Sequence, residues 1–337
     1  MILIINSQRR NKKIILFAEL ISMDSSVQSV LKRFLNVLLL AAILLSLTNC
    51  EKPAEYDPCS PYAETEKNVR SVYDQKARFT WGEYNDLLMK LSENKFVVLP
   101  LNEMRNYFDT SKVVVGLRHD VEHNPFKALE MATIEKSYGM KATYFILATA
   151  NYYGSFSNSK LIRNQGMGSL YKKIYNTGAE IGIHNDLLTV MISYKIDPFD
   201  FNNEELSFYK SLDIPIFGTA SHGSVISKVT VNNYWIFSDF SKKDSIEYEG
   251  IKYPLGQHTL KEFGFEYEAY FIDYQTYFSE SHGRWNDPEG LPGILKKLDA
   301  SKPGDRIQIL THPDHWGKQS ILHDMFRKIR SMSFDRH

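Results

Sequence analysis

Apolar runs alternate with helical patterns along most of this chain, and this alternation predicts its fold. Strand-like runs lie at residues 96–99, 113–117, 142–147, 181–183, 214–219, 234–238, 267–272 and 307–310. Helical patterns lie at residues 125–138, 170–177 and 204–212, and Thr80 to Glu83 has the sequence of a capping box that begins a further helix ending near Glu93. Such alternation is typical of βαβ units, so we expect a single α/β domain with parallel strands.

The boundary at residues 117–125 concentrates chemically active side chains. An apolar run ends there in two histidines and two carboxylates, Asp120 and Glu122, and Asn124 with Pro125 then has the pattern of a helix start. Loops at the carboxyl ends of parallel strands often carry the reactive groups of α/β enzymes. A solvated charged loop is the alternative, but this combination favours acid–base or metal chemistry.

Histidine recurs at the ends of other strand-like runs, at His184, His222 and His312. The whole chain has ten histidines, so their placement after strands is notable. If the strands are parallel, all these ends meet on one rim. We therefore expect a metal or acid–base site there rather than separate structural histidines.

Composition narrows the class of partner. The chain has 337 residues, of which 43% are hydrophobic, so it can bury a full core. Its formal net charge is zero and it has no long basic run, which argues against nucleic acid as a partner. Residues 166–168 lack the third glycine of a dinucleotide loop, because Tyr171 takes its place, and no Walker-type loop is present. We expect no nucleotide ligand.

Residues 1–49 have the pattern of a signal or targeting region, with Met23 as an alternative start. A basic pair at residues 32–33 precedes an apolar run at 37–47, and Cys50 follows. This order resembles a bacterial lipoprotein signal, in which Cys50 is lipidated. Residues 50–75 would then be a lipid-anchored tether and residues 76–337 the functional domain, at the cell envelope of a bacterium and facing the periplasm or the surface. An uncleaved membrane anchor, or a disulfide between Cys50 and Cys59, is the alternative.

Several motifs resemble those of the polysaccharide deacetylases, carbohydrate esterase family four, over about residues 80–320. They lie at residues 118–122 with 141–145, at 179–184, at 283–285 and at 310–313. The resemblance implies a distorted, partly open (β/α)7-type barrel with parallel strands for residues 76–337. It also implies metal-dependent removal of acetyl groups from an N-acetylated cell-surface or extracellular polysaccharide.

The resemblance implies catalytic roles for two residues. Asp120 matches the family's general base and His312 its general acid. A carboxylate cannot usefully deprotonate free water, whereas a divalent metal makes water far more acidic. Asp120 would thus take a proton from water activated by the metal, and His312 would give a proton to the leaving amine.

The resemblance also implies a metal site, usually for zinc. Glu122 and His184 match two of the family's ligands, but the second histidine expected four residues after His184 is Leu188. A catalytic zinc needs three protein ligands and an open position, so the third must come from elsewhere. His222 is the first candidate for the third ligand, with Asp186 and His123 as alternatives.

Four further residues are candidates for substrate binding. Trp285 and Trp316 would stack on the apolar faces of sugars, with ordinary packing as the alternative. Arg118 and Arg284 could hold an acidic group or orient Asp120, with structural ion pairs as the alternative.

Two other functions fit the sequence. A catalytically inactive lipoprotein could keep the barrel to bind glycan, with Leu188 marking loss of the metal site. A metal hydrolase of a non-sugar amide could use the same scaffold, because a fold does not determine its substrate.

Overall fold

The computed structural model describes residues 60–223 and 231–317. The predictions for the signal region, the alternative start at Met23 and the lipidation of Cys50 lie outside the described residues. Among the helices that are described, none is long and apolar enough to cross a membrane.

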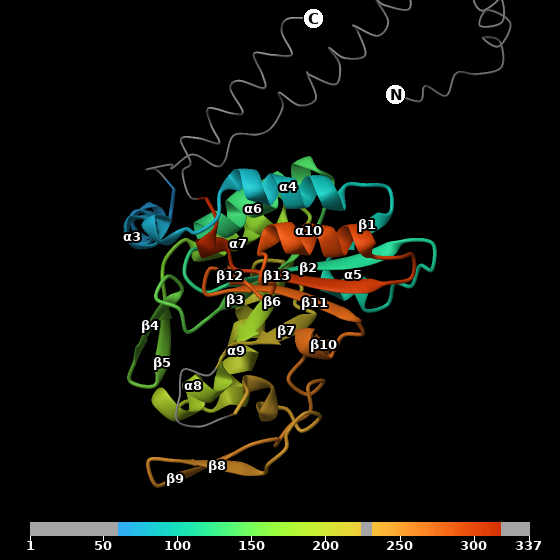
Figure 1. The fold of residues 1–337 in the computed structure, drawn as a ribbon. Helices are drawn as coiled ribbons and strands as arrows, with labels where there is room; N and C mark the ends of the chain where they lie inside the picture. The colour runs from blue at the N-terminus through green and yellow to red at the C-terminus, as the bar shows by residue number, and fades with distance from the viewer. Residues whose placement is uncertain (1–59, 224–230, 318–337) are drawn as a thin grey trace, which may run out of the picture. The chain divides into compact units, whose positions relative to one another are not determined.

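A curled, mainly parallel sheet forms the centre of the described fold (Figure 1). Its nine strands run in the order β10-β7-β6-β3-β2-β13-β11-β12, and β1 pairs with the first half of β2. Neighbouring strands are parallel, except that β12 runs antiparallel to β11. The strands are β1 (Phe96–Leu99), β2 (Val113–Val121), β3 (Thr143–Leu147), β6 (Glu180–Asn185), β7 (Gly218–Ser221), β10 (Tyr267–Glu268), β11 (Thr276–Ser281), β12 (Arg284–Trp285) and β13 (Arg306–Thr311). The predicted α/β class with parallel strands is confirmed.

Helices cover this sheet, which explains why β2, β3, β6 and β13 are buried along their whole length. The α-helices within the described residues are α3 (Ala63–Tyr73), α4 (Trp81–Leu91), α5 (Leu101–Met104), α6 (Pro125–Ser137), α7 (Met167–Tyr175), α8 (Leu187–Ser193), α9 (Pro198–Ser211) and α10 (Leu291–Ala300). In Figure 1, α4, α6 and α10 lie above the sheet, and α8 and α9 lie below it. Two hairpins, β4 (Gly154–Ser157) with β5 (Lys160–Arg163) and β8 (Ser245–Tyr248) with β9 (Ile251–Pro254), lie outside the sheet.

The two helix starts predicted from capping residues are confirmed. Thr80 Oγ1 accepts a hydrogen bond from the Glu83 backbone N–H at 3.1 Å, and the Glu83 carboxylate accepts from the Thr80 N–H at 2.7 Å. Asn124 Oδ1 accepts from the Lys127 N–H at 3.2 Å, ahead of Pro125 in the first turn of α6. These side chains satisfy N–H groups that a helix cannot pair internally.

Three predicted strands are wrong in whole or in part. The run at 214–219 becomes a strand only from residue 218, where β7 begins. The run at 234–238 overlaps a 3-10 helix, Asn233–Ile236, which buries Trp235 and Ile236 without pairing its backbone in the sheet. The run at 267–272 forms only the short β10 before a second 3-10 turn, Ala269–Phe271. An apolar run shows that a segment is buried, but short runs do not show which backbone form buries it.

The segment before residue 76 differs from the predicted tether, because residues 63–73 form helix α3. Tyr62 and Val69 are buried, and the Tyr62 ring lies 5.6 Å from the Phe126 ring of α6. Arg70 Nη1 donates to Glu130 Oε1 at 2.8 Å, so an ion pair also joins α3 to α6. Helical spacing of apolar side chains therefore places this part of the predicted tether in the folded body.

Candidate metal and catalytic site

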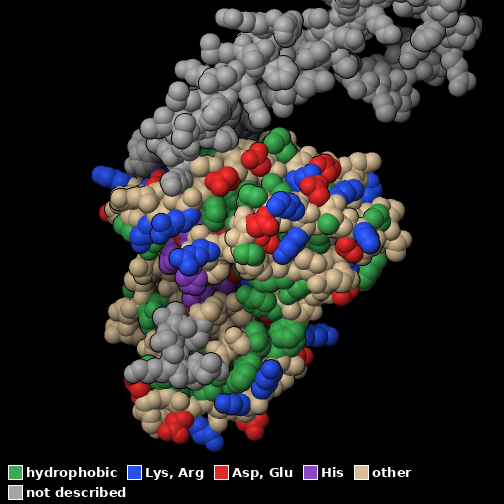
Figure 2. Space-filling model, viewed as in Figure 1, with side chains coloured by type: hydrophobic (Ala, Val, Ile, Leu, Met, Phe, Trp, Pro, Cys, Tyr) green, Lys and Arg blue, Asp and Glu red, His purple; other side chains and the backbone are tan. Residues whose placement is uncertain are grey.

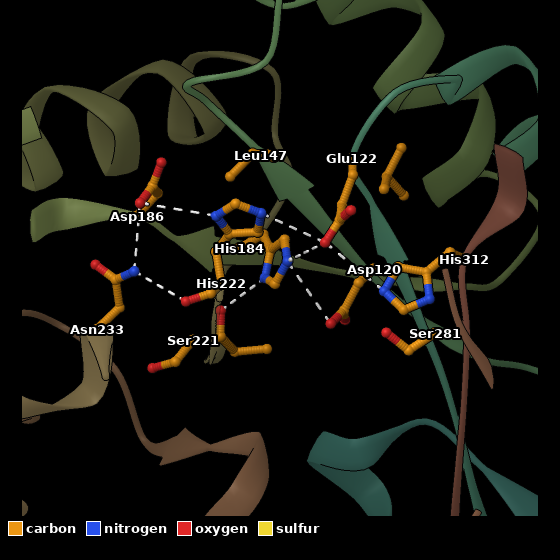
Figure 3. A network of polar contacts seen from close by, with 12 residues as sticks. Asp120, Glu122, Leu147, His184, Asp186, Ser221, His222, Asn233, Ser281 and His312 are labelled. Carbon is orange, nitrogen blue, oxygen red and sulfur yellow. Dashed lines mark hydrogen bonds and ion pairs between the residues drawn. The ribbon is translucent and has the colours of Figure 1, made fainter. Parts of the chain in front are cut away.

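The carboxyl ends of four parallel strands bring the predicted chemical groups together (Figure 3). Asp120 lies in β2 and Glu122 follows it, His184 lies in β6, His222 follows β7, and His312 follows β13. Histidine side chains are gathered in a hollowed part of the surface (Figure 2). Since neighbouring strands are in parallel register, their ends meet on one rim, as expected.

Glu122, His184 and His222 form a group that could hold a metal ion. Their ligand atoms all lie within 4.8 Å of one another. Glu122 Oε1 is 3.6 Å from His184 Nε2 and 3.4 Å from His222 Nε2. Two imidazole nitrogens and one carboxylate oxygen are a donor set that zinc accepts, and three protein ligands leave a position open.

The hydrogen bonding of His184 fits a ligand role. Its Nδ1 pairs with the carbonyl oxygen of Ala220 at 2.8 Å and must therefore carry the proton. Its Nε2 is buried, has no hydrogen-bond partner among the described residues, and points at Glu122 and Asp120. A buried, unpaired ring nitrogen is costly unless something binds it, so this atom supports a metal at the site.

His222 is held at the rim mainly through its backbone. Its N–H donates to the Asn185 carbonyl at 2.8 Å, and the Asn233 side-chain amide donates to its carbonyl at 2.9 Å. Burial alone would lower the pKa of His222, but Asp186 and Glu122 beside it raise that pKa to about 10. A metal bound at Nε2 would displace the proton there, as for any histidine ligand, so the end of β7 offers the imidazole that position 188 does not.

Of the alternative third ligands, neither Asp186 nor His123 belongs to this group. Asp186 accepts hydrogen bonds from Thr149 and Thr189, each at 2.7 Å, and its Oδ1 lies 3.7 Å from His222 Nδ1. His123 instead stacks on Tyr73 of α3, with ring centroids 4.9 Å apart. Asp186 therefore lies where a carboxylate would orient His222.

Replacing Asp186 with asparagine is expected to weaken zinc binding by about 10- to 100-fold, because it removes the carboxylate that faces His222 Nδ1. Competition with a chromogenic chelator measures this affinity. Asp86→Asn, on the exposed side of α4, is the matched control and should leave the affinity unchanged. Equal zinc affinities in the two variants would contradict a positioning role for Asp186.

Asp120 is held as a buried carboxylate beside the metal-ligand group. Arg118 Nε and Nη2 donate to its two oxygens at 2.8 and 2.7 Å, and its Oδ2 lies 3.7 Å from His184 Nε2. Burial would raise the pKa of Asp120, but Arg118 and His184 lower it by more. Arg118 is itself fully buried, so it orients Asp120 and is not exposed to a ligand.

The pKa of His312 is shifted in the opposite direction from that of Asp120. Burial would lower its pKa, but Glu280, Glu122 and Asp120 raise it to about 9. Its Nδ1 donates to the Glu280 carbonyl oxygen at 2.6 Å, and its Nε2 lies 3.7 Å from Glu122 Oε1. The ring is therefore protonated near neutral pH and directs Nε2 at the metal-ligand group.

Glu280 is a site residue that the sequence analysis missed. It lies at the end of β11, a strand that was not predicted, and its carboxylate accepts hydrogen bonds from the His312 N–H at 3.0 Å and from His315 Nδ1 at 2.6 Å. Glu280, His312 and His315 form a second group with metal-ligand types. The Gly283 N–H also donates to Glu280 Oε1, at 2.9 Å. With both oxygens accepting hydrogen bonds from the chain, Glu280 holds His312 in place.

Trp285 and Trp316, which were predicted to stack on sugars, are both buried. Trp316 is fully buried against Phe79 and Tyr84, and Trp285 packs on the same Phe79. Their apolar surface is used for packing, so neither ring offers a face to a sugar. Arg284 is exposed on β12, outside the metal-ligand group.

No protein-family model matches this chain, and no curated protein matches it. The family resemblance therefore rests on the motifs themselves.

Proposed function

We propose that this protein is a metal-dependent deacetylase that removes acetyl groups from an N-acetylated cell-surface or extracellular polysaccharide, on a partly open (β/α)7-type barrel. The observation that carries this proposal is the convergence of Glu122, His184 and His222, with Asp120 and His312 beside them. The predicted lipid anchor at Cys50 would place this activity at a bacterial cell envelope.

Glu122, His184 and His222 would hold the metal, and their nitrogen and oxygen donors suit zinc. A divalent ion supplies Lewis acidity there, which polarises a carbonyl and makes water more acidic. Two side chains of the protein carry out the proton transfers, one as a base and one as an acid. Neighbouring groups whose pKa values are shifted in opposite directions can take these opposite roles.

Asp120 is the general base in this proposal. Its lowered pKa keeps it ionised, and the two hydrogen bonds from Arg118 keep its carboxylate facing His184. It accepts the proton of the water that attacks the acetyl carbonyl. The buried Arg118 guanidinium cannot turn to solvent, so this orientation persists during the reaction.

His312 is the general acid. The Glu280 carbonyl accepts its Nδ1 proton, so the proton it can donate is on Nε2, which faces Glu122. Its raised pKa keeps that proton in place until the amine departs. The leaving sugar amine takes this proton, which completes the hydrolysis of the amide.

His222 supports this function over the inactive glycan-binding alternative. That alternative depends on Leu188 marking the loss of a ligand, yet Leu188 is buried in α8 while the end of β7 brings His222 to Glu122. The group keeps three donor atoms without a histidine at position 188.

The full chain is expected to bind stoichiometric zinc and to release acetate from N-acetylated oligosaccharides. A chelator should abolish that release and added zinc should restore it, because the amide carbonyl otherwise lacks a Lewis acid. Metal analysis and an acetate assay measure both, with N-acetyl-lysine as a non-sugar comparison. Zinc-free protein that releases no acetate would contradict the proposal, and preference for N-acetyl-lysine would favour the non-sugar amide hydrolase.

A further inference from the structure

A cavity of about 880 Å³ lies between α3 and the rim that carries the metal-ligand group. Glu122 and His222 line one end of it, so it is continuous with the site. Asn68 and Val72 line it from α3, and Asn151 lines it from the loop after β3. This volume is within the range of small-molecule sites. We call it the α3 cavity.

The wall formed by α3 is attached firmly to the rest of the site. Tyr73 stacks on His123 with an interplanar angle of 4°, and His123 is next to Glu122 in the chain. Just beyond α3, Asp74 Oδ1 accepts a hydrogen bond from Asn124 Nδ2 at 3.0 Å. α3 therefore bounds the cavity as a fixed wall, and it lies outside the region of family resemblance.

The lining determines which charge the cavity accepts. Glu122 belongs to the metal-ligand group and Asp186 pairs with His222. Away from them, the described lining residues include no lysine or arginine, whereas Glu64 on α3 adds a carboxylate. Away from the metal-ligand group and His222, an anionic group would lose hydration and meet the Glu64 carboxylate without a cation to pair with. The α3 side of the cavity therefore disfavours phosphate, sulfate and carboxylate groups.

The polar side chains of the lining favour hydroxyl and amide groups instead. Within residues 60–223 and 231–317, the side-chain amides of Asn68, Asn151 and Gln165 have no hydrogen-bond partner, and the bonds at Asn68 and Asn151 use their backbone carbonyls. Each amide can both donate and accept, which suits sugar hydroxyl and acetamido groups. Val72, with 47% of its surface exposed, adds apolar area on the same wall.

We infer that the α3 cavity binds the part of the substrate that flanks the reacting acetamido group, and that this part is an uncharged oligosaccharide segment rather than an acidic one. The inference rests on the proposed function for the position of the acetamido group. The cavity gives α3 a direct role in substrate selection.

Binding of matched probes to the full chain with Asp120→Asn, which slows turnover, tests this inference. The probes are an uncharged tetrasaccharide of N-acetylglucosamine and a hyaluronan tetrasaccharide, which carries carboxylates. Calorimetry is expected to show tighter binding of the uncharged probe. Adding Val72→Arg should weaken that binding about tenfold or more, because it fills and charges the cavity, and should shift preference toward hyaluronan.

Ser71→Arg is the matched control, since Ser71 is exposed on the same helix and does not line the cavity. Asn151→Arg changes the facing wall and leaves α3 unaltered. It should weaken binding as Val72→Arg does, which would show that the loss does not come from a local distortion of α3. Equal binding by the Ser71→Arg and Val72→Arg proteins, equal affinity for both probes, or no binding of either would overturn the inference.

The acetate assay separates this inference from the proposed function. Acetate release with no effect of Val72→Arg on binding would leave the deacetylase intact and overturn only the role of α3. Binding that depends on α3, without acetate release from any probe by the chain that retains Asp120, would overturn the deacetylase and keep the α3 cavity as an uncharged-glycan site.

Discussion

Replacing Asp120 with asparagine is expected to reduce kcat/KM for acetate release by about 10²- to 10⁴-fold, the usual contribution of a positioned general base. Asparagine has nearly the same shape but cannot accept the proton of the attacking water. Because Asp120 is outside the group formed by Glu122, His184 and His222, bound zinc should remain stoichiometric. Acetate release and metal analysis on the same preparation measure both effects.

The same substitution removes one of the three side-chain acceptors of the buried Arg118 guanidinium, which are the two Asp120 oxygens and Gln308 Oε1. We therefore expect a lower melting temperature as well, and kcat/KM must be measured on protein shown to be folded. Asp86→Asn is the matched control and should change none of these quantities. Folded, zinc-loaded Asp120→Asn protein with unchanged kcat/KM would remove Asp120 from the mechanism.

Replacing Glu135 with leucine is expected to lower the free energy of unfolding by about 3 kcal/mol or more, because three buried polar groups lose their acceptor. Glu135 Oε1 lies 2.7 Å from His119 Nε2 and also accepts from the Tyr84 hydroxyl, and Oε2 accepts from the Tyr144 hydroxyl at 2.8 Å. All four side chains are buried. Leucine is of similar size, so the loss reflects unpaired polar groups more than a cavity.

Denaturant unfolding monitored by tryptophan fluorescence measures this change. Glu204→Leu is the matched control, since Glu204 is exposed on α9, and it should change the unfolding free energy by no more than about 0.5 kcal/mol. Similar losses in the two variants would show that the network around Glu135 contributes little. His119 Nδ1 lies 2.7 Å from Thr311 Oγ1, so the network also joins β2 to β13 just before Asp120 and His312.

The local pattern of apolar runs and helix caps was enough to predict most of the elements that carry the site. The apolar runs around residues 113–117 and 307–310 are long enough, and end abruptly enough, to be recognised as buried strands, and the Thr80 and Asn124 caps mark helix starts. These signals depend on residues close together in the chain. β11 has six residues, as β13 does, but polar and partly exposed positions interrupt its apolar pattern, and the seven-residue α8 has no side-chain cap. Neither element was predicted.

The sequence by itself determined that Asp120, Glu122, His184 and His312 follow or end strands, because hydrophobic patterning and caps are local properties. Only the tertiary structure decided which of His222, Asp186 and His123 completes the metal-ligand group, since that choice depends on register between β6 and β7 and on the stacking of His123 with α3. Long-range packing likewise buries Trp285 and Trp316 and places α3 beside the rim. Burial of a side chain and distance across a sheet are properties of the assembled core, so no neighbouring residues in the chain encode them alone.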